Sequence, residues 1–510
     1  MAEAKTIPEL LEGGDPAAPA IGATDGVPPL SRGGLRDLAL RTVETLNALG
    51  VGRNDRVAIV LPNGPEMAAA FVSIASGATT APLNPAYRAE ELEFYLTDLK
   101  AKALVVEAGA ETPAIAVARR LGVPVVELVR ERERGAGTFA LRPVGAMGGP
   151  PARPGLAGPD DVALVLHTSG TTSRPKIVPL LQRNLMASAR HIVGTLGLGP
   201  ADVCLNVMPL FHIHGLVAAT LSSLAAGAQV SCSPGFHALK FFSWLDEVKP
   251  TWYTAVPTMH QAILARAERN REVVARSRLR LVRSSSSSLP PQVMAELERT
   301  FRAPVIEAYG MTEAAHQMAS NPLPPRPRKP GHVGVAAGPE VAIMDEAGDL
   351  LPAGATGEVV IRGPNVTPGY EANPEANARA FTNGWFRTGD QGVIDAEGYL
   401  RLTGRLKELI NRGGEKISPL EVDEVLMDHP AVQQVVTFGL PSERLGEEVA
   451  AAVVLREGKA VTERELREFA AARLADFKVP RRIVFLPEIP KGATGKLQRI
   501  GLAARLGLVA

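Results

Sequence analysis

Apolar and polar residues alternate along most of the chain in two patterns, one typical of buried strands and one typical of helices. Residues 35–49 carry apolar side chains at helical spacing, and the apolar run 56–61 that follows has the length of a strand. Strand–helix alternation of this kind predicts parallel sheets covered by helices, and therefore an α/β fold. The same patterns predict further strands at residues 103–106, 123–128, 162–166, 203–208, 252–256, 279–282 and 305–308, and further helices at residues 65–76, 90–99, 184–196, 215–226, 258–270 and 290–301.

The alternation of strands and helices is interrupted in two segments, and a different pattern takes its place in a third. Residues 1–34 and 135–159 are rich in Gly, Pro and Ala, so we expect an irregular lead-in and a surface connection there. Beyond residue 331, short apolar runs at 341–344, 357–362 and 399–402 are separated by Gly, Pro and Asn. This pattern predicts a small antiparallel or β-barrel-like subdomain.

The pattern changes once more at residues 404–407, where a compact α+β segment begins. Two of its helices are predicted by capping patterns, at Ser418–Glu421 and at Thr462–Glu465. We therefore predict a large N-terminal domain over residues 1–404, containing the α/β subdomains and the barrel-like one. A small α+β C-terminal domain is predicted over residues 405–510.

Composition narrows the class of protein. At 510 residues the chain is too long for one core, and 45% hydrophobic with 21% charged residues is ordinary for a globular protein. The formal net charge of +1 offers no basic surface for nucleic acid. Two cysteines, Cys204 and Cys232, are too few for a disulfide framework, and no spaced Cys/His set predicts zinc. Since no apolar leader or membrane-length apolar stretch is present, we expect a cytoplasmic protein without a membrane span.

A hydroxyl-rich loop, Thr168–Lys176, follows one of the predicted strands. Its N–H and O–H groups can point at phosphate oxygens, and Lys176 adds positive charge, so the loop predicts a polyphosphate site. The alternative is a solvated turn, because Ser, Thr, Gly and Pro are ordinary loop residues. A Walker A loop is excluded, because Pro175 precedes the lysine and Ile177 follows it.

Three further strand ends carry polar groups, at the edge where open α/β sheets bind ligands. The first holds Phe211, His212 and His214, which could equally be half-buried structural side chains. The second is the serine run Ser284–Ser288, whose alternative is a flexible linker. The third is Tyr309–Glu313, where a ring could stack on a base and a carboxylate could hold Mg²⁺, unless it is an ordinary helix start.

These motifs, taken in order, resemble those of the adenylate-forming enzymes, which include acyl-CoA synthetases, luciferases and peptide-synthetase adenylation domains. The resemblance runs from about residue 35 to residue 499, and its strength lies in the joint occurrence of the motifs. They are the loop Thr168–Lys176, Tyr309–Glu313, Arg387–Asp390, Gly404–Glu408 and Pro490–Lys496.

The resemblance implies the cosubstrates ATP and CoA, the metal Mg²⁺ and a small carboxylic acid, with no nucleic acid partner and no prediction of oligomeric state. Asp390 would accept hydrogen bonds from both ribose hydroxyls, and Arg405 would assist near the ribose. Without the resemblance, Asp390 would be interpreted as a turn residue and Arg405 as a surface charge. Glu313 would bind the metal. The phosphates would contact Thr168, Ser169, Gly170, Thr171, Thr172, Lys176 and Thr312, and the adenine would contact Ser286, Glu307, Ala308 and Tyr309.

The resemblance also implies a catalytic lysine and a mobile C-terminal domain. Lys496 would stabilise the transition state in which a carboxylate attacks the α-phosphate, since that step brings two anions together. Lys407 would be the hinge about which the domain turns. Gly413 and Gly414 would then face CoA and allow the close approach of its pantetheine arm, although they could also be a tight turn.

Among CoA ligases the resemblance is closest to the oxalate–CoA ligases, on the stretches Arg283–Leu289 and Glu307–Pro324. Small Ala314 and Ala315 followed by His316 stand where fatty or aromatic acids need an apolar pocket. A buried second carboxylate needs donors, and we expect His316 and Ser286 to supply them, with His212 beside the reacting carboxylate. The alternative for His316 is a structural role.

Two positions depart from the pattern of these ligases. Relatives often have cysteine where Ser285 stands and alanine where Gly310 stands. The resemblance as a whole predicts an oxalate–CoA ligase. The alternatives are a ligase for another dicarboxylic, fatty or aromatic acid, an adenylation enzyme that loads a carrier protein, and a catalytically silent nucleotide-binding protein. The last is disfavoured by the presence of Lys496, Asp390 and Glu313.

Overall fold

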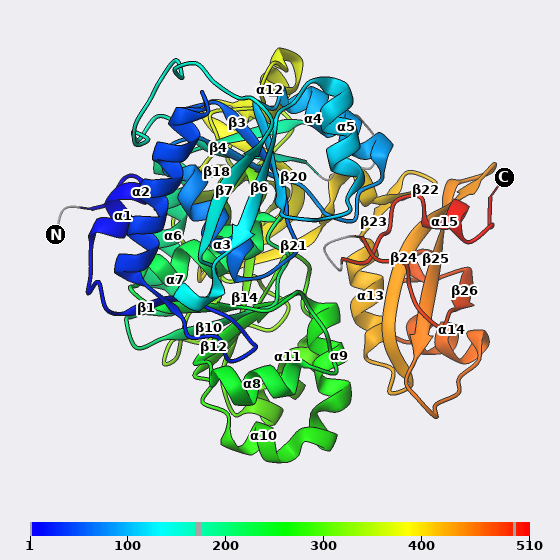
Figure 1. Cartoon of the computed structure of the whole chain (residues 1–510). Helices are drawn as coiled ribbons and strands as arrows, with labels where there is room; N and C mark the ends of the chain where they lie inside the picture. The colour runs from blue at the N-terminus through cyan, green and yellow to red at the C-terminus, as the bar shows by residue number, and fades with distance from the viewer. Residues whose placement is uncertain (1–2, 169–174, 493–495, 510) are drawn as a thin grey trace.

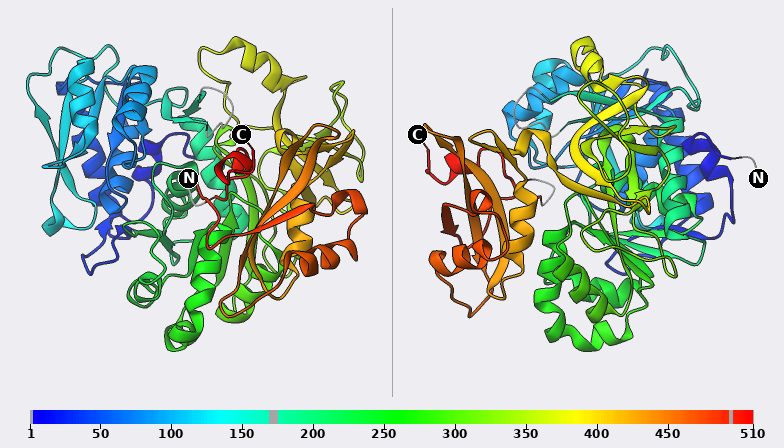
Figure 2. Two further views of the ribbon diagram at one scale, coloured as in Figure 1. Left: turned by 90° about the vertical axis from the view of Figure 1, so that its right-hand side faces the viewer. Right: turned by 180° about the vertical axis from the view of Figure 1, so that it is seen from behind.

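The structure is a computed structural model that describes residues 3–168, 175–492 and 496–509. Two large sheets form the core of the N-terminal part, and a third sheet and the C-terminal part lie against them (Figures 1 and 2). Within the described residues, no helix is both long and apolar enough to cross a membrane. The predicted α/β class is confirmed, with antiparallel sheets toward the C-terminus.

The first large sheet has seven strands in the order β7-β6-β5-β3-β4-β8-β9. Its five central strands are parallel, and an antiparallel strand closes each edge. The strands are β3 (Arg56–Val60), β4 (Thr79–Pro82), β5 (Ala103–Glu107), β6 (Val125–Arg130), β7 (Phe139–Val144), β8 (Val162–His167) and β9 (Ile177–Leu181). The helices that alternate with these strands along the chain are α2 (Arg32–Ala48), α3 (Pro65–Ala75), α4 (Ala89–Leu99) and α5 (Pro113–Leu121). Every residue of α3 is buried, which explains its apolar composition all round.

The second large sheet has nine strands in the order β16-β15-β14-β13-β12-β10-β11-β1-β2. Its strands are β1 (Pro19–Gly22), β2 (Leu30–Ser31), β10 (Val203–Asn206), β11 (Gln229–Cys232), β12 (Trp252–Ala255), β13 (Leu281–Ser285), β14 (Val305–Met311), β15 (His316–Ser320) and β16 (Val335–Ala336). Its helices are α6 (Gln182–Leu196), the π-helix η2 (His214–Leu221), α7 (Ser222–Ala225), α8 (Phe241–Val248), α9 (Pro257–Ala267), η3 (Glu268–Asn270), α10 (Arg271–Arg276) and α11 (Pro291–Phe301).

The register of the parallel strands β12, β13 and β14 brings polar residues from distant parts of the chain side by side. Thr254 pairs with Arg283, and Ser284 pairs with Glu307. Because parallel strands end at the same edge, the residues that follow them meet there.

A third sheet holds β17 (Glu340–Met344), β18 (Thr356–Arg362), β19 (Phe381–Thr382), β20 (Trp385–Ile394) and β21 (Leu400–Arg405), all antiparallel. The helix α12 (Pro374–Ala380) leads into it. Asp390 on β20 and Arg405 on β21 are direct partners in the register of these two strands. The predicted antiparallel subdomain is therefore confirmed.

The C-terminal segment forms a fourth sheet with its own core. Its strands are β22 (Ile410–Arg412), β23 (Glu415–Ile417), β24 (Val432–Ser442), β25 (Gly446–Leu455) and β26 (Arg482–Phe485). Its helices are η5 (Leu406–Glu408), α13 (Pro419–Met427), α14 (Glu463–Ala471), η6 (Asp476–Lys478) and α15 (Leu502–Arg505). The predicted caps are present, with Ser418 accepting from Glu421 N–H and Thr462 paired with Glu465. In Figure 1 the helix α13 lies on the side of this sheet that faces the N-terminal part.

Two expectations were wrong, and both concern short elements in the segments rich in Gly, Pro and Ala. The first 34 residues are not irregular: they form α1 (Ile7–Glu12), β1 and β2, and β1 pairs with β11. Residues 135–159 contain β7 and the preceding η1 (Arg132–Arg134) ends just before them. Buried Ile7, Leu10 and Ile21 hold the lead-in in place, although Gly, Pro and Ala surround them in the sequence.

Candidate active site

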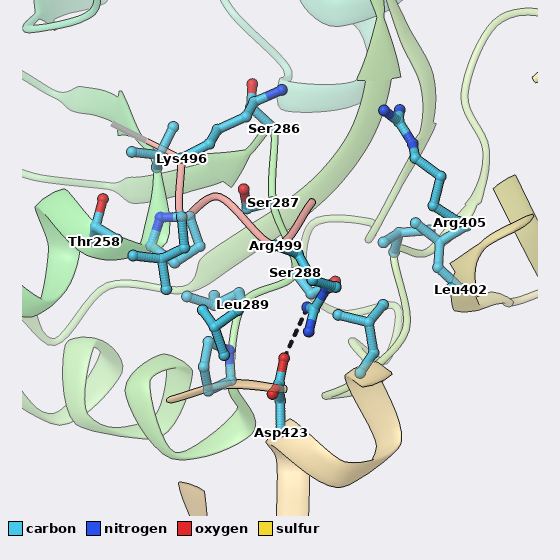
Figure 3. A pocket seen from close by; sticks show the side chains of 18 of the residues that line it. Thr258, Ser286, Ser287, Ser288, Leu289, Leu402, Arg405, Asp423, Lys496 and Arg499 are labelled. Carbon is cyan, nitrogen blue, oxygen red and sulfur yellow. Dashed lines mark hydrogen bonds and ion pairs between the residues drawn. The ribbon is translucent and has the colours of Figure 1, made fainter. Parts of the chain in front are cut away.

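A cavity of about 320 Å³ lies between the nine-stranded sheet and the C-terminal segment. Its walls come from four places that are far apart in the sequence (Figure 3). The serine run, the end of β14, the β20–β21 pair and the C-terminal segment supply Ser286, Ser287, Ser288, Ala308, Tyr309, Gly310, Asp390, Arg405, Asp423, Lys496 and Arg499. The cavity thus joins four of the five motifs on which the resemblance rests.

On one wall, Tyr309, Asp390 and Arg405 form a bonded group. The Tyr309 hydroxyl donates to Asp390 Oδ2 at 2.5 Å, and Arg405 Nε lies 3.0 Å from Asp390 Oδ1. Burial and the Asp390 carboxylate raise the pKa of the Tyr309 hydroxyl, and the same carboxylate raises the pKa of Arg405. A carboxylate accepts about four hydrogen bonds, so two acceptor positions are left for the predicted ribose contacts.

Lys496 enters the cavity from the C-terminal segment, and Figure 3 shows its side chain extending toward Ser286. Burial and the nearby Arg405 lower the pKa of its amine to about 8, while Asp390, Glu313 and Glu408 act in the opposite direction. A cation with a lowered pKa among carboxylates is a feature of functional sites. Residues 493–495 of its motif lie outside the described residues.

The predicted acid-binding side chains meet around His214, a residue for which the sequence predicts no specific role. Its Nδ1 lies 3.0 Å from Ser286 Oγ, its backbone N–H donates to His212 Nδ1 at 3.3 Å, and its ring centroid lies 5.1 Å from that of His316. Burial lowers the pKa of all three histidines, that of His212 to about 3. All three rings are therefore neutral near pH 7, and each can donate only one ring proton.

The backbone is strained where it presents this group. His316 has a φ of +104° and Ser286 a φ of +76°, conformations that cost non-glycine residues about 1–3 kcal/mol each. His316 also approaches Gly310 so closely that a Cβ there would lie 1.9 Å from the His316 carbonyl oxygen. Glycine rather than alanine at position 310 is thus required by the position of His316. His316 Nδ1 is buried with no hydrogen-bond partner among the described residues.

Glu313 lies on the phosphate side of the site, beside Tyr370 and Lys176. The Tyr370 hydroxyl donates to Glu313 Oε1 at 2.8 Å, and Lys176 Nζ lies 4.3 Å from the centre of the Tyr370 ring. Burial raises the pKa of the Glu313 carboxyl because it destabilises the charged form. A metal cation bound beside this carboxylate would stabilise the charged form. No group of three or more Cys, His, Asp or Glu ligands occurs among the described residues, but Mg²⁺ in nucleotide sites commonly uses one or two carboxylates and the phosphates themselves.

The remaining predicted residues are less informative. Lys176 N–H donates to Thr168 Oγ1 at 3.0 Å at the base of a hairpin between β8 and β9, while Ser169, Gly170, Thr171 and Thr172 lie outside the described residues. Thr312 begins the short helix η4 (Thr312–Ala314).

Four other predicted residues, Glu307, Lys407, Gly413 and Gly414, are not among those that line the cavity. Glu307 accepts from Leu289 N–H at 2.8 Å, and burial raises the pKa of its carboxyl to about 8, so it anchors the serine run. Lys407 is exposed in η5. Gly413 and Gly414, with φ of +61° and +95°, form the turn between β22 and β23, which by itself requires glycine-like backbone.

The sequence did not direct us to Thr254, Arg283 or Tyr370. Thr254 and Arg283 lie in buried strands, and Thr254 Oγ1 is 2.6 Å from His214 Nε2. A charged residue inside an otherwise apolar strand was the available signal for Arg283. Tyr370 lies 57 positions beyond Glu313, and no local pattern links the two.

Comparison with known proteins supports the resemblance. The AMP-binding enzyme family matches residues 15–371, and the AMP-binding enzyme C-terminal domain matches residues 421–496. An oxalate–CoA ligase of Arabidopsis thaliana is 48% identical over 477 residues, 92% of each chain. An oxalate–CoA ligase of Saccharomyces cerevisiae is 44% identical and covers 88% of this chain and 86% of its own. The crystal structure of ATP-bound MatB from Rhodopseudomonas palustris superposes with a TM-score of 0.85 at 30% identity, covering 97% of each chain.

Proposed function

Because the chain belongs to the AMP-binding enzyme family and is an AMP-forming acid–CoA ligase that uses ATP and CoA, we propose that its acid is oxalate. The observation that carries the proposal is the buried group of Ser286, His214 and His316 beside the cavity. An acyl chain or an aromatic ring needs apolar surface at that place, whereas a second carboxylate needs donors. The names of the two similar ligases support the same acid.

The reaction has two steps. A carboxylate oxygen of the acid attacks the α-phosphorus of ATP, pyrophosphate leaves, and an acyl-adenylate forms. The thiolate of CoA then attacks the acyl carbon, AMP leaves, and the thioester forms. The amine of Lys496 stabilises the first transition state, since two anions approach each other there and a cation offsets their repulsion.

The acid is held by donors at both ends. His212 Nδ1 already accepts a backbone N–H, so the ring proton of this neutral histidine is on Nε2, from which it donates to the reacting carboxylate. Ser286 and His316 donate to the distal carboxylate. Because both carboxylates of oxalate share one carbon–carbon bond, the distal donors also fix the direction of attack.

Nucleotide and metal are bound by the residues of the other walls. Asp390 holds the ribose with Arg405 beside it, Tyr309 and Ala308 line the adenine with Ser286 and Glu307 next to it, and Lys176 with the hydroxyl-rich loop and Thr312 contact the phosphates. Glu313, oriented by Tyr370, would contribute a carboxylate oxygen to Mg²⁺. The metal, when bound to the phosphates, offsets their charge and holds them in position.

The two steps need two orientations of the C-terminal domain, for which we propose the boundary 404/405 and a hinge at Lys407. In the described orientation Lys496 lies in the cavity, as adenylation requires. Rotation about Lys407 then brings the Gly413–Gly414 turn to the cavity for the attack by CoA. The free, buried thiols of Cys204 and Cys232 are compatible with the predicted cytoplasmic location.

The proposal is tested by release of pyrophosphate over a panel of acids, each with and without CoA. Oxalate should give the highest kcat/KM, with oxalyl-CoA formed only when CoA is present. A preference for malonate, hexanoate or benzoate would identify one of the alternative acids. Turnover that requires a carrier protein and ignores CoA would contradict the assignment as a CoA ligase.

A further inference from the structure

A buried cation, Arg283, lies behind the acid-binding group, and its hydrogen-bond partners among the described residues are His214, Thr254 and Gln317. It is fully buried on β13, and no Asp or Glu contributes to its electrostatic environment among the described residues. Its Nη1 lies 3.5 Å from both His214 Nε2 and Thr254 Oγ1, and its Nη2 lies 3.4 Å from Gln317 Oε1. Its Nε has no hydrogen-bond partner in the part of the chain that the structure describes. Burying an unpaired charge costs free energy, so the burial of Arg283 requires a functional explanation.

The donors and acceptors around Arg283 fix the direction of a chain of hydrogen bonds. A guanidinium can only donate, so a proton on His214 Nε2 would point toward a cationic N–H and is disfavoured. His214 Nε2 is therefore the acceptor of the 2.6 Å contact, and the Thr254 hydroxyl is its donor. The Thr254 oxygen in turn accepts from Arg283.

The chain continues to the wall of the cavity. With Nε2 acting as an acceptor, neutral His214 carries its proton on Nδ1, and this N–H donates to Ser286 Oγ at 3.0 Å. The oxygen of Ser286 is then occupied by that donor, so its hydroxyl proton is free to point into the cavity that Ser286 lines. Each member donates in the same direction, which polarises the last O–H.

We propose that Arg283 and Thr254 are positioning residues that, through His214, hold the Ser286 hydroxyl as a donor toward the distal carboxylate of the acid. This inference rests on the proposed function, since it names how that carboxylate is selected. The positive charge of Arg283 behind the neutral donors favours a dianionic acid over a monocarboxylate, because only the dianion places negative charge at this end. Thr254 and Arg283 are direct partners in the register of β12 and β13, so the backbone fixes their separation.

Thr254 offers a matched pair of variants that should preserve the fold. Thr254→Val keeps the shape and removes the hydroxyl, whereas Thr254→Ser keeps the hydroxyl. We expect Thr254→Val to lower kcat/KM for oxalate by about tenfold to a hundredfold, as for loss of a hydrogen bond to a charged group. For acetate the loss should stay below about threefold, and Thr254→Ser should stay near the wild type with both acids. Equal oxalate activity in the two variants would overturn the proposal.

The protonation state of His214 provides a readout that packing alone would not change. In ¹⁵N-histidine-labelled enzyme, two-bond ¹H–¹⁵N correlations distinguish protonated Nδ1 from protonated Nε2, and the signals of His214 are identified by their loss in His214→Gln. We expect Nδ1–H in the wild type and in Arg283→Lys, and a mixture of tautomers in Arg283→Met, where Thr254 is free to accept from Nε2–H. Protonation on Nε2 in the wild type would also overturn the proposal.

The two measurements separate this inference from the proposed function. The tautomer is read in the free enzyme and does not depend on the acid, so the NMR result judges the hydrogen-bond chain alone. If Arg283→Met does not fold, the tautomer of His214 in the wild type and the comparison of Thr254→Val with Thr254→Ser still test the proposal. Failure of the wild-type enzyme to use oxalate would count against the proposed function and against the role at the distal carboxylate, whatever the tautomer.

Discussion

Replacement of Lys496 by alanine is expected to separate the two half-reactions. Only adenylation brings two anions together, so loss of the amine should slow this step by about 10²–10³-fold, the usual cost of one preorganised electrostatic donor. Thioester formation from supplied acyl-adenylate should change by less than about threefold. Lys491→Ala is the matched control, because Lys491 belongs to the same segment but is exposed and paired with Glu488.

The lowered pKa of Lys496 adds a pH dependence to the same prediction. With a pKa of about 8 the amine is about 90% protonated at pH 7 and about 10% protonated at pH 9. Adenylation by the free enzyme should therefore be present below pH 8 and be lost as the pH rises through 8. Lys496→Arg keeps its charge at every pH used, so whatever activity it retains should not decline over this range.

The assay follows pyrophosphate release at saturating ATP for adenylation, and thioester formation from oxalyl-adenylate and CoA for the second step. Both are measured between pH 6.5 and 9.5 for the wild type and the three variants. Equal loss of both half-reactions in Lys496→Ala, or an alkaline decline in Lys496→Arg that matches the wild type, would refute the assigned role.

Three further results are expected. Lys407→Pro restricts the hinge, so adenylation should continue while thioester formation falls at least about tenfold; wild-type overall turnover would exclude the hinge. His316→Ala should lower kcat/KM for oxalate by about 10- to 150-fold and leave acetate and hexanoate unchanged or improved, and equal losses on all acids would contradict the distal contact. Glu307, whose folded pKa of about 8 exceeds its ordinary 4.5, contributes stability that is present below pH 4.5 and lost as the pH rises through 8. Glu307→Gln should therefore flatten the fall in melting temperature across that window, and an unchanged pH profile of the melting temperature would exclude this titration.

The sequence allowed prediction of those features that depend on neighbouring residues. The apolar run and polar end of β13 are adjacent in the chain, so both the strand and the serine run at its end could be recognised. The capping residues Ser418 and Thr462 likewise act within one helical turn. The strands β1 and β7 could not be predicted, because each lies in a segment rich in Gly, Pro and Ala and is held by pairing with a neighbouring strand, β11 or β6, rather than by a local pattern.

The acid-binding group shows the same division. Ser286, His316 and His214 all follow recognisable strands, but the contacts of His214 with the other two form only when the strands are assembled in the sheet. The pairing of Thr254 with Arg283 exists only because β12 and β13 lie in this register. Such cross-strand relations depend on the fold as a whole and have no periodic signal in the chain.

The proposed acid is tested most directly by competition. Wild-type enzyme is incubated with ATP in limiting amount, CoA in excess, and equal concentrations of oxalate, malonate, acetate and hexanoate, and the CoA thioesters are quantified by mass spectrometry. Because all four acids compete for the same enzyme, the product ratio gives the ratio of their kcat/KM values. Oxalyl-CoA should exceed each other thioester by at least about tenfold. A product dominated by hexanoyl-CoA or acetyl-CoA would contradict a site built around donors for a second carboxylate.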